Sequence, residues 1–258
     1  LYSRGFSSLF GEWKSTPEAK KLKAKGQTKA FSESVRLPLP KKPFELVIYT
    51  RQRSGKTARV MQTRLDPASP KIRTWAPSPG VAVKVLHQSG PVDKKLDILI
   101  IGDGYTGNDQ AKFLADAKRF TRVLLSDGTF GKYKGQYNVR ALFVPSPKSG
   151  VSQPRKGRVL NTPIGLSFNT FDSPRYLMTA QNLKLREVAA NAPYDALYLM
   201  ANTSRYGGGG IYNLYSTFPS DNEYDAYVFI HEFGHSFAGL ADEYYDSSVS
   251  YDDSEFYP

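Results

Sequence analysis

Apolar and polar residues alternate with a period of two in three segments between residues 44 and 86. These segments are FELVIYT (44–50), ARVMQTRL (58–65) and VAVKVL (81–86). A two-residue period is typical of strands that bury one face, and RQRSGK (51–56) between the first two is typical of a turn. The pattern therefore predicts a small antiparallel β unit, without any helical period.

The pattern changes after QSGPVD (88–93), a segment of turn-forming residues. LDILIIG (96–102) is a continuous apolar run, typical of a strand buried on both faces, and apolar positions between 113 and 124 then recur at helical spacing. The turn GDGYT (102–106) between them lacks the GxGxxG spacing of dinucleotide-binding folds and the lysine of a P-loop. We expect a structural turn, with Asp103 or Thr106 capping the helix.

Two more apolar segments complete the predicted sheet. NVRALFVPS (138–146) and YDALYLMAN (194–202) are expected to be central strands, with a helix over 177–192 beside them. We therefore predict two domains: a smaller, β-rich (sandwich-like) domain over residues 1–90 and an α/β (α+β) domain over residues 91–258.

Basic residues are concentrated in the N-terminal region. Residues 1–90 contain 18 lysines and arginines against 5 acids, a charge of +13, whereas residues 91–258 contain 17 against 19, a charge of −2. Residues 221–258 contain ten acids and no lysine or arginine. The lysine-rich opening can bind an anionic surface polymer, but a solvated, weakly ordered face is the simpler expectation, and no specific nucleic acid is expected as a partner.

The composition limits the chemistry and the location of the protein. Because there is no cysteine, a transition metal must be held by His, Asp or Glu. No apolar run reaches the roughly 18 to 20 residues of a membrane helix, so no transmembrane segment is expected. The chain begins at Leu1 without a leader, and we expect an extracellular or periplasmic protein.

The strongest chemical signal is His231-Glu232-Phe233-Gly234-His235, an HExxH motif that contains two of the three histidines. On a helix, a spacing of four residues places both imidazoles on one face, where they can bind one ion. Two histidines and a third protein ligand leave a position for water on Zn²⁺, and Glu232 beside it can take the proton of that water. The motif predicts one catalytic zinc and a general base.

The third ligand is expected shortly after the motif. Gly239 can end the helix with a positive φ and turn the chain back. Asp242, three residues later, is the first choice, because zinc sites that end HxxGxxH or HxxGxxD use this spacing, and Glu243 is the alternative. In this chain the glycine is four positions after His235, whereas in those sites it is three positions after the histidine. We therefore expect the helix to run one residue longer.

Several segments resemble the IgA-peptidase-type family of zinc metallopeptidases: HEFGHSFAGLADEYY, YDALYLMAN, YGGGGIYN and LDILIIGDGYT. The resemblance covers residues 91–245 and implies a zincin-like catalytic domain after an N-terminal β domain. It also implies that His231 and His235 are ligands, that Glu232 is the base and that an acid of GLADEY is the third ligand. All three methionines precede the motif and the chain ends soon after it, so we expect a C-terminally incomplete catalytic domain.

Residues around the motif are candidates for further roles. An open edge strand that pairs with an extended peptide is expected at Gly208, Gly209, Gly210 and Ile211, with a flexible loop as the alternative. Tyr244 is the candidate for stabilising the oxyanion, together with its neighbour Tyr245, although ordinary packing explains both as well.

The acidic C-terminal segment and the isolated histidine carry weaker signals. A structural Ca²⁺ or a preference for basic peptides is one interpretation of Asp246, Asp252, Asp253 and Glu255, and a solvated tail is the other. His87 lies in the basic β region, far from the motif, and is expected to be structural.

These observations predict a zinc metalloendopeptidase that acts on peptide or protein substrates, with Glu232 activating the metal-bound water. One alternative is a zinc amidase that acts on cell-wall material. The other is an adhesion module in which the basic N-terminal region binds an anionic polymer and the metal site is vestigial.

Overall fold

Contacts divide the protein into two units. The computed structural model describes residues 1–52, 54–72 and 81–242. The larger unit comprises residues 1–34 and 77–240, and the smaller unit contains residues 35–76. Within the described residues, no helix is both long enough and apolar enough to cross a membrane.

A six-stranded mixed sheet forms the centre of the larger unit. Its order is β3-β5-β4-β6-β8-β7, with β4, β5, β6 and β8 mutually parallel and the two edge strands antiparallel to their neighbours. The bounds are β3 (Ala82–His87), β4 (Leu96–Asp103), β5 (Tyr137–Phe143), β6 (Ala196–Ala201), β7 (Gly209–Ile211) and β8 (Tyr215–Pro219). The predicted central strands are confirmed, because β4, β5 and β6 each have a neighbour on both sides.

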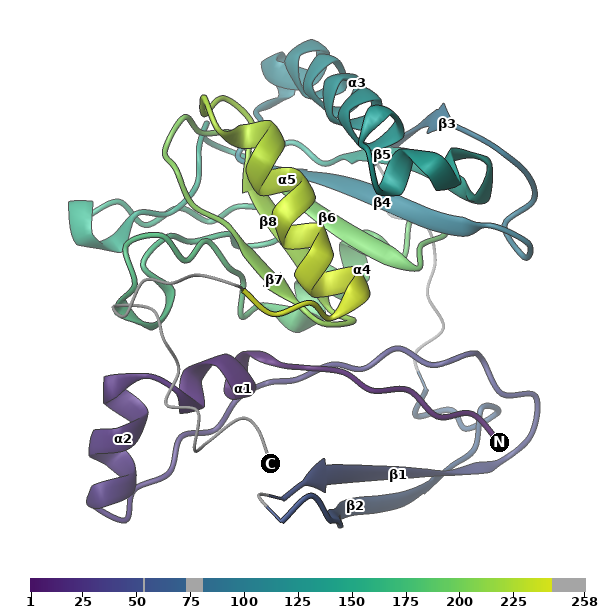
Figure 1. The fold of residues 1–258 in the computed structure, drawn as a ribbon, viewed down its shortest axis with the longest axis vertical. Coiled ribbons are helices and arrows are strands. Elements are labelled where there is room, and N and C mark those ends of the chain that lie inside the picture. The colour runs from purple at the N-terminus through teal and green to yellow at the C-terminus, as the bar shows by residue number, and fades with distance from the viewer. Residues whose placement is uncertain (53, 73–80, 243–258) are drawn as a thin grey trace. The chain divides into compact units, whose positions relative to one another are not determined.

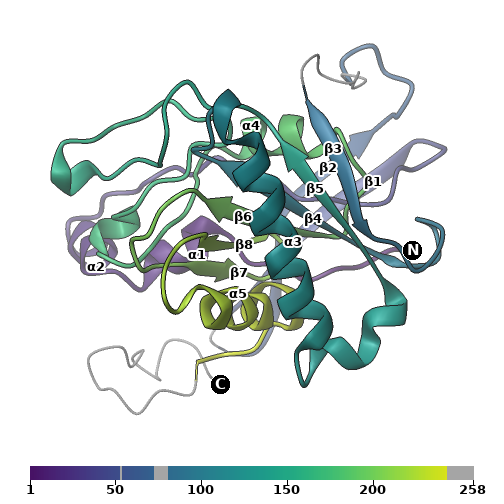
Figure 2. The same cartoon turned by 90° about the horizontal axis from the view of Figure 1, so that it is seen from above.

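Helices cover both faces of this sheet. α3 (Gln110–Ser126) and α5 (Asp225–Phe233) lie on one face, and α4 (Asn182–Ala189) lies on the other (Figures 1 and 2). The short 3₁₀ turns are η1 (Gly107–Asp109), η2 (Phe130–Gln136), η3 (Pro154–Lys156) and η4 (Thr170–Asp172). The predicted helices over 113–124 and 177–192 are thus confirmed in kind, with different bounds.

Successive residues of each buried strand pack alternately into two separate hydrophobic cores. Ile98 and Ile100 pack with Phe113 of α3 and Phe229 of α5, whereas Leu99 and Ile101 belong to the core that contains α4. Side chains of a strand alternate between faces, so a strand covered on both sides needs the uninterrupted apolar run seen at 96–101.

The first 34 residues fold onto the larger unit, which corrects the expectation of a weakly ordered face. α1 (Leu9–Lys14) inserts Leu9 into the core on the α4 side, and α2 (Pro17–Ala24) follows it. The Asn182 side chain donates to the carbonyl of Ser32 at 2.6 Å and accepts from the hydroxyl of Ser34 at 2.9 Å. The N-terminal segment is therefore ordered by α4.

The smaller unit contains a two-stranded antiparallel hairpin. β1 (Phe44–Arg51) pairs with β2 (Thr57–Leu65), with a register irregularity between Ile48 and Tyr49. This hairpin confirms the prediction for the two alternating segments. The third segment was wrongly grouped with it, because β3 pairs with β5 in the larger sheet. Alternation shows that a strand has one covered face but not which sheet it joins.

Candidate metal centre

Aromatic packing fixes α5, the helix that carries most of the HExxH motif, against the sheet. The ring of Tyr198 on β6 stacks on Phe229 and Phe233, with centroids 4.1 and 4.9 Å apart. The hydroxyl of Tyr198 also donates to the carbonyl of Phe229 at 3.2 Å. Because these residues are fully buried, α5 has little freedom to rotate about its axis.

Polar contacts hold both ends of α5. At its start, the Arg119 guanidinium on α3 contacts both carboxylate oxygens of Asp225, at 3.1 and 2.8 Å. At its end, the hydroxyl of Ser216 on β8 donates to the carbonyl of Glu232 at 3.1 Å and contacts the hydroxyl of Ser236. The helix that presents the motif is therefore clamped between α3 and β8.

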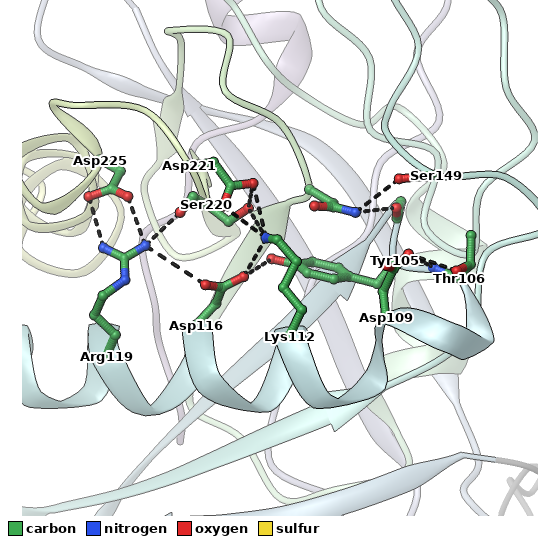
Figure 3. A network of polar contacts seen from close by, with 12 residues as sticks. Tyr105, Thr106, Asp109, Lys112, Asp116, Arg119, Ser149, Ser220, Asp221 and Asp225 are labelled. Carbon is green, nitrogen blue, oxygen red and sulfur yellow. Dashed lines mark hydrogen bonds and ion pairs between the residues drawn. The ribbon is translucent and has the colours of Figure 1, made fainter.

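The first of these contacts belongs to a larger charged network between α3 and the end of β8 (Figure 3). Lys112 contacts Asp116 at 2.7 Å and Asp221 at 2.9 Å, and the hydroxyl of Tyr105 donates to Asp116 at 3.1 Å. Burial opposes the charge of Lys112, but the hydrogen bonds of Asp116 and Asp221 together raise its pKa. No local pattern in the sequence marks this network as a whole, because it joins residues of α3 to residues 220–225, about 100 positions later.

α5 continues into a π-helical turn, η5 (Gly234–Ala238), which ends at Gly239. Gly239 has a φ of +68°, and its N–H donates to the carbonyls of both His235 and Gly234. The glycine with positive φ is confirmed. The wider π turn accommodates the additional residue between His235 and Gly239, and such π turns are frequent at functional sites.

The two histidines of the motif direct the same type of nitrogen towards each other. Nε2 of His231 and Nε2 of His235 are 3.0 Å apart. Nδ1 of His235 lies 2.6 Å from the carbonyl oxygen of Leu240, which only accepts, so Nδ1 carries a proton and donates it. In the neutral ring Nε2 is then unprotonated and available as a metal ligand.

Asp242 offers a third donor atom. One ligand atom from each of His231, His235 and Asp242 lies within 4.8 Å of the other two. Two imidazole nitrogens and a carboxylate oxygen are donors that Zn²⁺ accepts at about 2.0 to 2.2 Å. This donor set fits a zinc ion with one open position. Glu243, the alternative ligand, lies outside the described residues.

The side chain of Glu232 lies against the edge strand β7. A Cβ atom added to Gly208 would lie 2.7 Å from Oε1 of Glu232, and one added to Gly210 would lie 3.1 Å from Oε2. Residues two apart on a strand face the same way, so both glycines face α5. Because neither glycine has a side chain, the Glu232 carboxylate has room to lie beside them.

Part of the predicted peptide-binding edge is already paired. The N–H of Gly208 donates to Arg175 at 3.1 Å, and its carbonyl accepts from Leu177 at 3.2 Å. β7 itself, which includes Gly209, Gly210 and Ile211, is the edge strand of the sheet and pairs with β8. The substrate role of these residues stays a prediction.

Asp103, at the end of β4, does not cap the following helix. Its buried carboxylate accepts hydrogen bonds from the hydroxyl of Thr162 at 2.7 Å and from the N–H of Leu166 at 2.8 Å. Burial raises the pKa of Asp103 to about 6, although these hydrogen bonds oppose the shift. Of the two capping candidates, Thr106 lies at the helix start, where its N–H donates to Asp109 at 2.8 Å.

The remaining candidates are His87 and six residues that follow Asp242 in the sequence. His87 is 2.9 Å from the carbonyl of Lys134 through Nε2, as a structural histidine would be. The other candidates fall outside the described residues: Tyr244, Tyr245, Asp246, Asp252, Asp253 and Glu255.

Comparison with known proteins connects both parts of the chain to one family. The family model described as IgA Peptidase M64 matches residues 84–258, and the model described as Peptidase M64 N-terminus matches residues 1–62. A comparison with curated proteins finds no match. Because the first model alone spans more than half of the sequence and includes the HExxH motif, the chain belongs to the IgA peptidase M64 family, a family of metallopeptidases.

Proposed function

We propose that this protein is a zinc-dependent endopeptidase whose metal is held by His231, His235 and Asp242. The observation that carries the proposal is the convergence of these three donors within 4.8 Å, with Glu232 between the two histidines in the motif. A bound zinc ion supplies a Lewis acid that polarises the scissile carbonyl and makes water more acidic. An extracellular or periplasmic location is part of the proposal.

Glu232 serves as the general base and then as the general acid. Its carboxylate accepts the proton of the attacking water and returns it to the leaving nitrogen, so the amine departs as a neutral group. The space beside the carboxylate supports this role, because neither Gly208, which precedes β7, nor Gly210 on β7 has a side chain that would occupy it. Ser216 fixes the backbone of Glu232 through its carbonyl.

His235 is oriented by the chain that follows it. The hydrogen bond from Nδ1 to the carbonyl of Leu240 selects the tautomer whose Nε2 carries no proton, as a metal ligand requires. The turn at Gly239 therefore has two roles: it positions this carbonyl, and it leads the chain to Asp242. The substrate is proposed to be an extended peptide beside Gly209, Gly210 and Ile211. The family name does not identify immunoglobulin as the substrate of this chain.

Metal content tests the ligand set without relying on activity. We expect about one zinc per chain by elemental analysis, lost in His231→Ala and His235→Ala, while Glu232→Gln retains it. Asp242→Asn should weaken zinc affinity by roughly a factor of ten or more, because a neutral amide replaces the anionic ligand. Glu243→Gln is the matched control, since it removes the same charge one residue away.

The outcome for the two neighbouring acids decides the third ligand. Loss of zinc in Glu243→Gln with retention in Asp242→Asn would assign the role to Glu243. Zinc retained in all four ligand variants would overturn the proposed site. If zinc binds as expected but only cell-wall fragments are cleaved, the protein is an amidase with the same metal centre.

A further inference from the structure

A pocket of tyrosine side chains lies one helical turn before the first metal-binding histidine. Its volume is about 320 Å³, and it is lined by Tyr206, Asn222, Glu223, Tyr224 and Tyr227. Tyr206 and Tyr224 meet edge to face, with ring centroids 6.2 Å apart. The pocket is open to solvent, because between 40% and 56% of the surface of each tyrosine is exposed.

The pocket is directly connected to the proposed metal centre. The ring of Tyr227 stacks on the ring of His231 at a centroid distance of 5.4 Å and an interplanar angle of 23°. Residues four apart on a helix have Cβ atoms about 5 to 6 Å apart. A peptide whose scissile carbonyl is at the metal therefore has a neighbouring side chain within reach of this pocket, since consecutive residues of an extended chain are about 3.3 Å apart.

Hydrogen bonds hold the walls of the pocket in place. Asn222 accepts from the N–H of Tyr224 at 3.0 Å and donates from its side chain to the carbonyl of Ser204 at 2.9 Å. The N–H of Asp221 donates to the carbonyl of Thr203 at 3.2 Å. The loop that carries Tyr206 is thereby tied to the start of α5, and a pocket with fixed walls binds without the entropic cost of ordering them.

The basic side chains near the pocket contact groups outside it. Arg205 lies over the ring of Phe168, and its guanidinium donates to the carbonyl of Pro174 at 2.7 Å. Lys112 is paired with Asp116 and Asp221, and Arg119 is paired with Asp225, as Figure 3 shows. Acids outside the pocket therefore balance Lys112 and Arg119, and Arg205 contacts neutral groups outside the pocket.

Glu223 is the only acid that lines the pocket. None of the described residues donates a hydrogen bond to its carboxylate or forms an ion pair with it. The neighbouring acids Asp221 and Asp225 are paired with Lys112 and Arg119, so Glu223 is the charge that the pocket itself offers. The pocket therefore combines an available negative charge with the faces of three electron-rich rings.

We propose that this pocket binds a lysine or arginine side chain of the peptide substrate and so determines cleavage specificity. The quadrupoles of tyrosine rings attract a cation beside them, and its aliphatic stem packs on the same rings. Glu223 adds a charged hydrogen-bond acceptor. The assignment rests on the proposed peptidase function and specifies the side chain that this site selects.

Paired peptides measure the contribution of the charge. A position-scanning series places lysine, its neutral isostere norleucine, phenylalanine or glutamate at the two positions on each side of the cleaved bond. At one position we expect kcat/KM for lysine to exceed that for norleucine by about tenfold. Glu223→Gln should reduce this ratio about three- to tenfold, with little change for the norleucine peptide.

The matched control is Asp93→Asn, which removes one negative charge from an exposed position before β4, whereas the pocket follows the end of the parallel strand β8. It should leave the lysine-to-norleucine ratio unchanged. Glu223→Lys should reverse the order and favour the glutamate peptide. An unchanged ratio in both Glu223 variants, or a wild-type preference for phenylalanine or glutamate at every position, would overturn the pocket assignment.

A binding measurement separates failure of the pocket from failure of the peptidase. Fluorescence anisotropy with labelled lysine and norleucine peptides is carried out on Glu232→Gln, with and without Glu223→Gln. Tighter binding of the lysine peptide that depends on Glu223 supports the pocket even if no peptide is cleaved. Equal binding of both peptides overturns it, whereas cleavage without any basic preference leaves the peptidase intact and removes only the specificity claim.

Discussion

Glu232 and the two glycines that face it form the most closely packed part of the proposed centre. A Cβ on Gly208 would lie 2.7 Å from Oε1 of Glu232, 2.8 Å from a Val228 methyl and 3.0 Å from the backbone carbonyl of Thr217. A Cβ on Gly210 would instead lie 2.5 Å from the backbone carbonyl of Glu232 and 2.8 Å from Cβ of His235. The two positions therefore differ in what must move.

This difference predicts different consequences for two alanine substitutions. Gly208→Ala should lower kcat about ten- to hundredfold with a smaller loss of stability than Gly210→Ala, because its closest contact is the carboxylate and its backbone contact is the longer one. Gly210→Ala should lower kcat and also destabilise the fold by about 1 to 3 kcal/mol, because the backbone of α5 must move. Peptide cleavage and urea unfolding measure the two effects.

Gly128→Ala is the control for both variants, since a Cβ there meets no atom within 4 Å. It should change neither the cleavage rate nor the midpoint of unfolding. Full activity in both Gly208→Ala and Gly210→Ala would show that the position of Glu232 does not depend on the bare face of β7.

The residues of the HExxH motif could be identified from the sequence, but the residues that hold the motif in position could not. HExxH is a local pattern, so His231, Glu232 and His235 could be identified from their spacing. The supports of the motif come from other elements: Ser216 from β8, Tyr198 from β6 and Arg119 from α3. No local pattern marks them, because each becomes a neighbour only when the sheet forms.

At the scale of elements, α5 depends on α3 for its position. The Asp225 side chain is largely buried, and Arg119 neutralises it from α3, which raises the pKa of the arginine. Asp225 also lies in the first turn of α5, where a negative charge is favourable. The pair therefore links the start of α5 to the helix before β5.

Removal of the arginine tests this link. Arg119→Met should lower the free energy of unfolding by about 1 to 3 kcal/mol, because the Asp225 carboxylate is left buried without its partner. The double variant Arg119→Met with Asp225→Asn should recover part of the loss. Arg122→Met, on the exposed side of the same helix, is the control. Equal stability of the two single arginine variants would contradict the role of the pair.

Prediction of the elements succeeded where one period dominates a segment. The buried strand at 96–103, the helix at 110–126 and the hairpin of residues 44–65 follow directly from their apolar spacing. The π turn η5 could not be predicted as such, because it differs from an α-helix by one residue in a single turn. Its only signal was the unusual distance between His235 and Gly239.

At the scale of the whole molecule, a buried carboxyl should influence the stability of the larger unit as pH changes. Burial raises the pKa of Asp103 to about 6, above the value of about 3.9 in an unfolded chain. Its stabilising contribution is therefore fully present below pH 3.9 and is lost as pH rises through 6. The shift corresponds to about 3 kcal/mol.

Comparison with Asp103→Asn isolates this contribution. Between pH 4 and pH 7, the unfolding free energy of the wild type should fall by about 2 kcal/mol relative to that of the variant. Urea unfolding at a series of pH values measures the difference. A constant difference over this range would mean that the pKa of Asp103 is not raised in the folded protein.

The predicted organisation of the whole chain remains partly untested. The boundary near residue 90 stays a prediction; the family models match residues 1–62 and 84–258, so the second match begins before this boundary. The charge asymmetry suggested two regions. It could not predict which parts of the protein the first 34 residues contact. Those contacts depend on Leu9 and on the Asn182 hydrogen bonds, which join positions more than 140 residues apart.

Cleavage of a mixed peptide library by the zinc-loaded protein tests the central claim most directly. The wild type and Glu232→Gln are compared at equal zinc content, with a chelator to remove the metal and zinc to restore it. We predict cleavage by the wild type that the chelator abolishes and zinc restores, and a loss of about 10²- to 10⁴-fold in Glu232→Gln. Equal cleavage by both proteins, or cleavage that persists without metal, would contradict the assignment of this site as a metallopeptidase centre.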